Sequence, residues 1–228
     1  MINNNERTQI INDLINSGVS IPCPDGVIIE KNVEIGKDTV IMPNTVLMGN
    51  VKIGKGCVIG PNSYIVDTVV GNNTKLNNTQ AYSSKIGSGV TAGPFVHIRP
   101  NCDIADNVHI GNFVEVKNST VDEGSKLPHL LYVGDSDVGK DVNFGCGCVT
   151  VNYDGRNKSR TIVKDGAFIG CNTNLVAPVT VGENAFTAAG STITEDVPDN
   201  SLAVARNRQV VKNDWVNIKK PYKRQHLK

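Results

Sequence analysis

An aliphatic residue recurs at every sixth position through most of this 228-residue chain. The first run is Ile29, Ile35, Ile41, Leu47, Ile53, Ile59 and Ile65, the second is Ile86, Ala92, Ile98, Ile104, Ile110 and Val116, and the third is Ile169, Leu175, Val181, Thr187 and Ile193. Small or β-branched residues such as Val33, Cys57 and Val90 stand four positions later. A period of six is typical of a parallel β-helix, in which each hexad supplies a short strand and a turn, and three hexads close a triangular coil.

The hexads predict an all-β prism, and a narrow interior suits a chain in which aromatic residues make up only 5%. The aliphatic residue points inward, and the residue four positions later must be small because three faces converge there. Consecutive coils stack about 4.8 Å apart, so residues three hexads apart in one run lie above each other. Known proteins with this repeat wind their coils left-handed, although the pattern does not show the hand. We therefore expect a left-handed parallel β-helix.

Three segments are expected along the chain. Residues 1–20 form an N-terminal helix and cap, because Asn3 and Glu6 resemble a capping box and Gly18 stops the helix. Residues 21–205 form the β-helix, from which a polar loop at 152–160 projects. Residues 206–228 form a tail, which we expect to be solvated and partly disordered at its end. Basic residues gather at this end, namely Lys219, Lys220, Lys223 and Arg224.

Charge and composition exclude several classes of protein. The net charge of +1 gives no field that would attract nucleic acid. No apolar stretch is long enough to span a membrane, and the polar start MINNNERTQ is unlike a signal peptide. The six cysteines form no CxxC pair, so we expect reduced thiols in a cytoplasmic protein. Cys57, Cys102 and Cys148 fall at inward positions and are expected in the core.

Arg99 and Lys117 stand three hexads apart in the second run. Stacked coils would place these two cations at one edge, and like charges so close are unfavourable unless an anion joins them. The spacing therefore predicts a phosphate clamp, in which the guanidinium suits bidentate contact. In the alternative, both side chains extend into water or pair with Glu115 and Asp103. His97 also precedes Glu115 by three hexads, so imidazole and carboxylate should stack.

A second edge carries small residues. Cys171 and Ala189 are three hexads apart, and Arg206 follows about one coil later. Small side chains would leave a groove along the prism, suited to a long thin ligand that ends in phosphates, although small residues at turns are also routine. His97 and His109 are two hexads apart and hence on different faces, so we predict no metal site.

The stretch from His129 to Lys158 is the longest break in the hexads and gathers residues that can do chemistry. His129 follows Pro128 in what we expect to be an irregular loop, and its imidazole can accept a proton near neutral pH. The loop that begins after Thr150 is too polar for the core. It should project from the prism and carry Lys158 into a site built mostly by another subunit.

Several motifs of this chain resemble one family. HLLYVGD, NFGCGCVTVNYDGRNK, IGCNTNLVAPVTVG and AAGSTITEDV, with RPN and IGNFVEVKNS upstream, resemble the acetyltransferase domain of N-acetylglucosamine-1-phosphate uridyltransferase / glucosamine-1-phosphate N-acetyltransferase. The likeness runs from about Arg7 to Trp215. It implies a homotrimer with active sites between subunits. The implied reaction moves acetyl from acetyl-CoA to the amine of glucosamine 1-phosphate, for UDP-N-acetylglucosamine synthesis. It needs no metal, and the uridyltransferase half is missing from the chain.

The resemblance also implies roles for individual residues. His129 matches the catalytic base. Arg99, Lys117, Tyr132, Asn143 and Lys158 match the contacts to the sugar phosphate, and Asn152, Tyr153, Cys171, Ala189 and Arg206 match positions at the acetyl-CoA site. Cys171 stands where the family often has serine, and a thiol is a weaker hydrogen-bond donor than a hydroxyl. Two alternatives stay open: an acyltransferase acting on another amino sugar, and a non-catalytic trimeric module.

Overall fold

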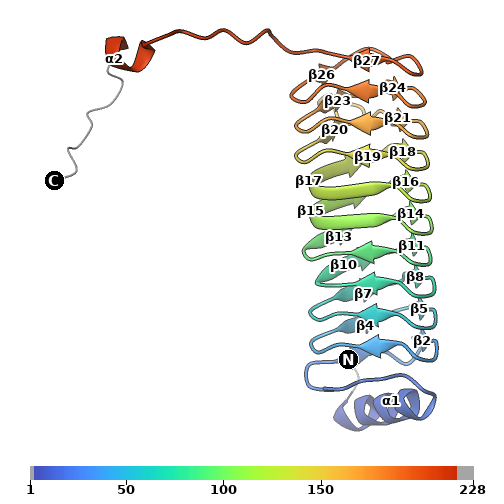
Figure 1. Ribbon diagram of the computed structural model, residues 1–228. Coiled ribbons are helices and arrows are strands. Elements are labelled where there is room, and N and C mark those ends of the chain that lie inside the picture. Colours follow the sequence, from blue (N-terminus) through green and yellow to red (C-terminus); the bar gives the residue numbers. More distant parts are fainter. Residues whose placement is uncertain (1–2, 220–228) are drawn as a thin grey trace, which may run out of the picture.

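The computed structural model describes residues 3–219, which form one straight prism of stacked coils with helix α1 (Asn4–Asn16) at one end (Figure 1). A tail leaves the last coil and carries the short helix α2 (Trp215–Lys219). The basic residues Lys220, Lys223 and Arg224 of the predicted tail lie outside the described part of the chain. Among residues 3–219, no helix is long and apolar enough to cross a membrane.

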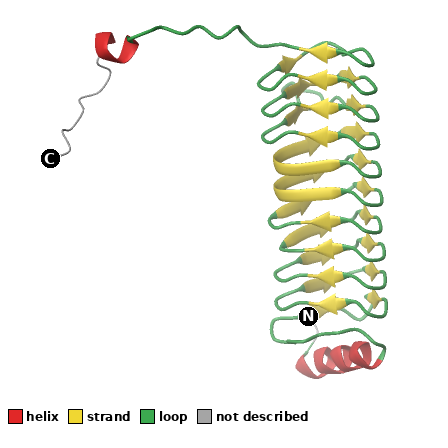
Figure 2. Cartoon of the chain, viewed as in Figure 1, coloured by secondary structure: helices red, strands yellow, loops and turns green. Residues whose placement is uncertain are grey.

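All pairings between the named strands are parallel, and the strands lie on three faces (Figure 2). The first face carries β1 (Ile28–Ile29), β4 (Val46–Met48), β7 (Tyr64–Val66), β10 (Thr79–Tyr82), β13 (Val96–Ile98), β20 (Val149–Val151), β23 (Asn174–Val176) and β26 (Thr192–Ile193). The second face carries β3 (Val40–Ile41), β6 (Val58–Ile59), β9 (Lys75–Leu76), β12 (Thr91–Ala92), β19 (Asn143–Phe144), β22 (Phe168–Ile169), β25 (Phe186–Thr187) and β27 (Leu202–Ala203). The third face carries β2 (Glu34–Ile35), β5 (Lys52–Ile53), β8 (Val69–Val70), β11 (Lys85–Ile86), β14 (Asp103–Ile104), β16 (Thr120–Val121), β18 (Ser136–Val138), β21 (Thr161–Val163) and β24 (Val179–Val181).

Two long strands, β15 (His109–Lys117) and β17 (Lys126–Gly134), turn a corner of the prism without a break. They join the second face to the first, so that these two faces make one 18-stranded sheet, whereas the third face is a separate nine-stranded sheet. The bends fall at Phe113 and Leu130, whose φ angles are 57° and 52°. Lys117, His129 and Tyr132 of the candidate site lie on these two strands.

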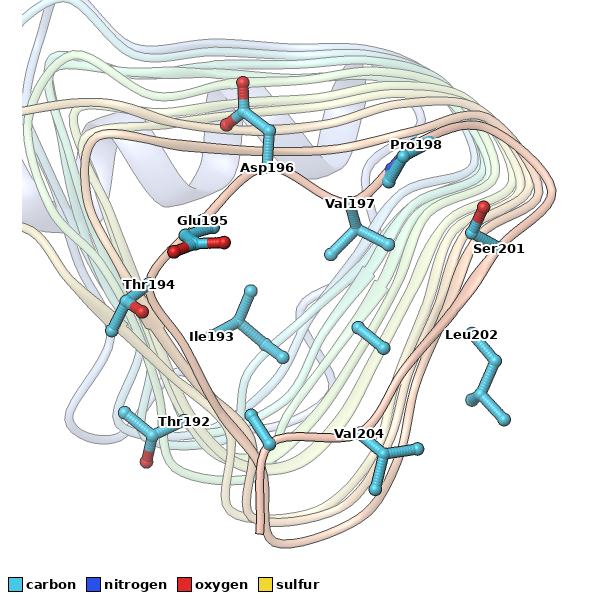
Figure 3. A pocket seen from close by; sticks show the side chains of 12 residues that line it. Thr192, Ile193, Thr194, Glu195, Asp196, Val197, Pro198, Ser201, Leu202 and Val204 are labelled. Atoms are coloured by element: carbon cyan, nitrogen blue, oxygen red, sulfur yellow. The ribbon is translucent and has the colours of Figure 1, made fainter.

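The interior of the prism holds the predicted runs. Every member of the three aliphatic runs is buried except Ile35, which packs partly exposed against the core. Cys57, Cys102 and Cys148 are buried as predicted, and all six cysteines are free thiols. Figure 3 shows the triangular section at the last coil, where Ile193 and Val197 point inward. The hexad period is therefore confirmed as the pattern of one continuous core.

Helix α1 covers the first coil, as the capping residues predict. The Asn3 side chain accepts from the amide of Glu6, and the Glu6 carboxylate accepts from the amide of Asn3. Ile11 is buried against the first coils, and Arg7 Nε donates to the carbonyl of Val27 at 2.7 Å. Because the ends of a solenoid expose its core, this helix protects the N-terminal end of the stack.

The coils differ in length, and this sets which residues stack. Ile28 pairs with Val46, so that coil is three full hexads long. Ile65 pairs with Ala81 and Ile110 pairs with Leu127, and both of these coils are shorter than three hexads. The predicted slip of the hexads near Val69 corresponds to the short coil that ends at Ala81. The coil from Val151 to its partner Val176 is longer than three hexads, because loop 152–160 is inserted into it.

Candidate active site

Two cations stack where the first face meets the third, at what we call the cation edge. Ile98 of β13 pairs with Val116 of β15, and the amide of Arg99 donates to the carbonyl of Val116 at 2.8 Å. Arg99 and Lys117, which follow these residues, therefore lie on consecutive coils, as their spacing predicts. His97 pairs with Glu115 in the same register, which confirms that stack.

Each cation of this stack has a carboxylate partner within the chain. Arg99 Nη1 lies 2.9 Å from Glu115 Oε1, as the alternative interpretation allowed, and this hydrogen bond raises the pKa of the guanidinium. Lys117 Nζ lies 3.3 Å from Asp135 Oδ2. The alternative prediction that Asp103 pairs with one of these cations is wrong. Its carboxylate lies on the third face, 3.9 Å from Nζ of Lys85.

Asp135 is a buried carboxylate at the centre of this edge, with a side chain only 7% exposed. It accepts hydrogen bonds from the side-chain amides of Asn118 and Asn152 as well as from Lys117. Burial alone would raise the pKa of Asp135, but the hydrogen bonds from Asn118, Asn152 and Lys117 together lower it below its ordinary value. Asp135 is therefore ionised at neutral pH and balances the charge of Lys117.

Loop 152–160 leaves the prism at the same edge as a short hairpin. The amide of Ser159 donates to the carbonyl of Asn152 at 2.9 Å, and Tyr153 and Lys158 form an antiparallel bridge. At the tip, the Asp154 carboxylate accepts from two backbone amides, at 2.6 and 2.7 Å. Asn152 is buried, whereas residues 153–158 are exposed, so the hairpin stands out from the first face.

Lys158 lies beside Lys117 of its own chain. A hydrogen bond and the charge of Lys117 lower the pKa of Lys158, and the more distant Arg99 acts in the same direction. Lys158 and Lys117 of one chain therefore lie close together, and the expectation that Lys158 completes a site built mostly by another chain stays a prediction. Within one chain the hairpin closes against the cation edge, so Arg99, Lys117 and Lys158 of that chain gather there.

Tyr132 lies on the first face between the cations and the next corner. It pairs with Glu115 in the ladder between β15 and β17. Its ring covers Gly134, because a Cβ on Gly134 would lie 2.4 Å from the Tyr132 hydroxyl oxygen. Gly134 pairs with Lys117 in the ladder between β15 and β17. The phenol of Tyr132 therefore lies over the coil that follows the coil of Lys117.

His129 lies in β17 and not in an irregular loop, so this prediction is wrong. It pairs with Asn112 of β15, and its Nδ1 lies 2.7 Å from Asn112 Oδ1. The long strand bends at Leu130 instead of ending, which disturbs the hexads without breaking the ladder. An amide oxygen only accepts hydrogen bonds, so Nδ1 carries the proton and Nε2 offers its lone pair. The side chain of His129 is exposed.

A column of residues continues from His129 along what we call the histidine edge, where the second face meets the first. The amide of Gly147 donates to the carbonyl of His129 at 3.3 Å, that of Asn172 to Cys146 at 2.8 Å, and that of Gly190 to Cys171 at 2.8 Å. Side chains on consecutive coils of this edge are, in order, His129, Cys146, Cys171 and Ala189. This confirms the stacking of Cys171 with Ala189 and brings His129 into the same column.

Arg206 departs from the predicted register. Thr187 pairs with Ala203 in a coil shorter than three hexads, so Arg206 lies beyond the position above Ala189. Its Cδ instead lies 3.8 Å from where a Cβ on Gly190 would stand. The last coil is shorter than a regular one because the chain leaves the prism there. Arg206 is exposed at the end of the histidine edge.

The predicted site residues therefore divide between two edges of one chain. The cation edge gathers Arg99, Lys117, Tyr132, Asn152, Tyr153 and Lys158, and the histidine edge gathers His129, Cys171, Ala189 and Arg206. Asn143 of β19 pairs with Lys126 and Phe168 on the second face, shortly before Cys146, and belongs with the histidine edge. The extended strand between His129 and Gly134 separates the two edges by up to ~16 Å.

Sequence reasoning missed Asp135, Asn112, Asn118 and Cys146. The first of these could have been found, because the motif HLLYVGD ends on an acidic residue at a turn. Asn112 and Cys146 needed the true register, since each lies one position short of three hexads from His129.

A hollow at the last coil holds none of the predicted site residues. This hollow, shown in Figure 3, is lined by a single coil, between Thr192 and Ala205. Within residues 3–219, no group of three or more His, Cys, Asp or Glu side chains is arranged to hold a metal ion.

Comparison with known proteins agrees with this geometry. The family model described as bacterial transferase hexapeptide (six repeats) matches residues 32–66, 83–118 and 160–195. The chain belongs to this hexapeptide-repeat family. A solved structure of Arabidopsis UDP-N-acetylglucosamine acyltransferase shares the β-helix fold, with a TM-score of 0.68 over 79% of this chain and 70% of that chain, at 18% identity.

This hexapeptide-repeat chain is more similar to proteins named bifunctional protein GlmU. The protein of Geobacillus sp. (strain WCH70) is 56% identical over 211 residues, which are 92% of this chain and 46% of that protein. The protein of Carboxydothermus hydrogenoformans is 54% identical over 203 residues, 89% of this chain and 46% of that protein. The chain thus spans about half the length of the curated relatives it matches.

Proposed function

We propose that this chain is a glucosamine-1-phosphate N-acetyltransferase, which moves acetyl from acetyl-CoA to the amine of the sugar phosphate. The observation that carries the proposal is a single surface with three clustered cations at one edge and, at the other, a histidine whose Nε2 is free to accept a proton. The resemblance of HLLYVGD and NYDGRNK to an acetyltransferase domain, and the high identity to proteins named GlmU, support it.

The cation edge binds the sugar phosphate. Arg99, Lys117 and Lys158 carry three positive charges against two carboxylates, Glu115 and Asp135. A phosphate dianion relieves the repulsion between Lys117 and Lys158, and Arg99 can contact it with two N–H groups. The phosphate fixes the sugar so that its amine, on the neighbouring carbon, meets the thioester.

His129 acts as the base, because an ammonium group has no lone pair with which to attack a thioester. Nε2 accepts the proton of the amine, while Asn112 holds the ring through Nδ1–H. General base catalysis of this kind contributes about 10²–10⁴ in rate. A backbone N–H near Asn152 or Cys171 stabilises the oxyanion that forms on the carbonyl.

Acetyl-CoA, the acetyl donor, binds along the histidine edge. Cys171 and Ala189 are small, and Arg206 at the end of their column meets the phosphates of the cofactor. This orientation points the thioester along the column toward His129. The transfer itself uses no metal, and the free cysteines suit an enzyme of the cytoplasm.

The active enzyme is a homotrimer with sites between chains. Phosphate and amine of the acceptor are on neighbouring carbons, whereas His129 and the cations of one chain lie at opposite edges of the first face. The cation edge of one chain therefore meets the histidine edge of the next. Phe95, Phe113 and Leu130 form an exposed apolar row beside His129, in which the Phe95 and Phe113 rings stack with centroids 5.1 Å apart. Such a row supports the proposal that a second chain packs against this edge.

Release of CoA thiol from acetyl-CoA, measured with the purified protein and each of several amines, tests this function. We expect turnover with glucosamine 1-phosphate, much less with glucosamine 6-phosphate and little with free glucosamine. Preference for another amino sugar would reassign the acceptor. Absence of thiol release with every amine, from a folded protein whose light-scattering mass is that of a trimer, would favour a non-catalytic module.

A further inference from the structure

We infer that Asp135 is a positioning residue that links the sugar-phosphate half of the site, bound by the cation edge, to the acetyl-CoA half, which Asn152 contacts from that edge where it meets the histidine edge of the next chain. The inference rests on the proposed function and goes beyond it, because Asp135 contacts one residue from each half. Its Oδ2 lies 3.3 Å from Nζ of Lys117, which binds the sugar phosphate, and also accepts from the side-chain amide of Asn152, at the acetyl-CoA position.

The burial of Asp135 makes these contacts strong. The residue is 5% exposed and Asn152 is 8% exposed, so water cannot replace a lost partner. The side-chain amide of Asn118 donates a further hydrogen bond to Oδ1 of Asp135. A buried, ionised carboxylate with three donors fixes each donor in one orientation, because any other would leave a buried polar group unpaired.

The backbone also fixes Asp135 at the edge. Its amide donates to the carbonyl of Lys117 at 2.9 Å, and its carbonyl accepts from the amide of Thr161, directly after loop 152–160, at 3.1 Å. One residue thus joins the coil of Lys117 to both ends of the hairpin that carries Lys158. Movement of this carboxylate would change the sugar-phosphate half and the acetyl-CoA half together.

The substitution Asp135→Asn removes the charge and keeps the shape, and asparagine tolerates the φ of 48° at this position. An amide here presents N–H groups to a neighbour that also donates, so Asn152 or Lys117 loses its acceptor. A matched control is Asp67→Asn, since Asp67 has a φ of 47° at the same edge, two coils away from Arg99, and accepts from the backbone amide of Asn50.

Calorimetric titration of each ligand separately into the oligomer tests the inference. Asp135→Asn should weaken glucosamine 1-phosphate and acetyl-CoA alike, by about 10- to 100-fold each, whereas Asp67→Asn should change neither. Loss of affinity for one ligand only, or for neither, would overturn the inference. If the wild-type protein binds neither ligand, the proposed function fails instead.

A second measurement leaves Asp135 in place, in case its substitution prevents folding. Lys117→Ala should weaken acetyl-CoA, which it does not touch, and Asn152→Ala should weaken the sugar phosphate, because each leaves the shared carboxylate short of one donor. Strictly separate effects, with each substitution weakening only its own ligand, would show that Asp135 does not couple the halves.

Discussion

Gly134→Ala should lower the activity of the enzyme while leaving it folded. The three atoms nearest to an added Cβ all belong to the Tyr132 ring, at 2.4, 2.6 and 2.8 Å. Gly134 lacks the positive φ that would strain an alanine, and the partly exposed Tyr132 ring can swing into solvent. We therefore expect stability within about 1 kcal/mol of wild type, a shift of roughly 2–4 °C in Tm.

The effect on activity follows from the contact that the displaced ring loses. A hydrogen bond from the Tyr132 hydroxyl to a charged phosphate contributes about 1.5–3 kcal/mol, which is roughly 10- to 100-fold in kcat/KM. Tyr132→Ala should cost as much as Gly134→Ala, and the double substitution should cost no more than either alone.

Thiol-release kinetics and thermal melts of the four proteins measure this. Gly145→Ala is the contrasting variant, because its Cβ would lie 2.4 Å from the backbone nitrogen of Cys171, which cannot swing away. That substitution should lower Tm more than Gly134→Ala does. Wild-type activity of Gly134→Ala, or additive losses in the double variant, would refute the placement of Tyr132 in the site.

Three further predictions concern the base, the cations and the core. His129→Ala should lower kcat by ~10²–10⁴ and keep KM for the sugar phosphate within a few-fold of the wild-type value. Turnover near that of the wild type would contradict the assignment of His129 as the base. Arg99→Ala and Lys117→Ala should weaken glucosamine 1-phosphate far more than glucosamine in competition assays; equal losses would show that they are not phosphate ligands. Burial raises the pKa of the Cys148 thiol from 9.0 to about 11, so its contribution to stability is present below pH 9 and lost as pH rises toward 11. Chemical denaturation across this range should show a decline that Cys148→Ala reduces, because burial also raises the pKa of the Cys57 and Cys102 thiols. An unchanged decline in that variant would contradict a contribution from Cys148.

Much of the fold could be predicted because the hexad period states directly which residues point inward. The buried runs, the core cysteines and the capping box of α1 follow from local spacing alone. Stacking of Arg99 on Lys117 could also be predicted, because their coils are regular.

The other features of the fold and of the candidate site depended on the length of each coil, which cannot be read from the hexad pattern. A corner turned inside β17 looks like a broken hexad, which led to the wrong placement of His129. The shortened last coil moved Arg206 from its predicted position. The closure of the Lys158 hairpin onto Asp135 through Asn152 is a tertiary contact, which the spacing of residues in the sequence does not reveal.

Mixing inactive subunits tests the central claim most directly, namely that one acetyl transfer joins the cation edge of one chain to His129 of another. Trimers assembled from His129→Ala and Lys158→Ala chains, verified by pull-down of two tags, should regain part of the thiol-release activity, because some sites then receive both intact edges. Lys117→Ala mixed with Lys158→Ala is the matched control. It should stay inactive, since these cations share one edge of one chain. Mixed His129→Ala and Lys158→Ala trimers that remain inactive would contradict the account.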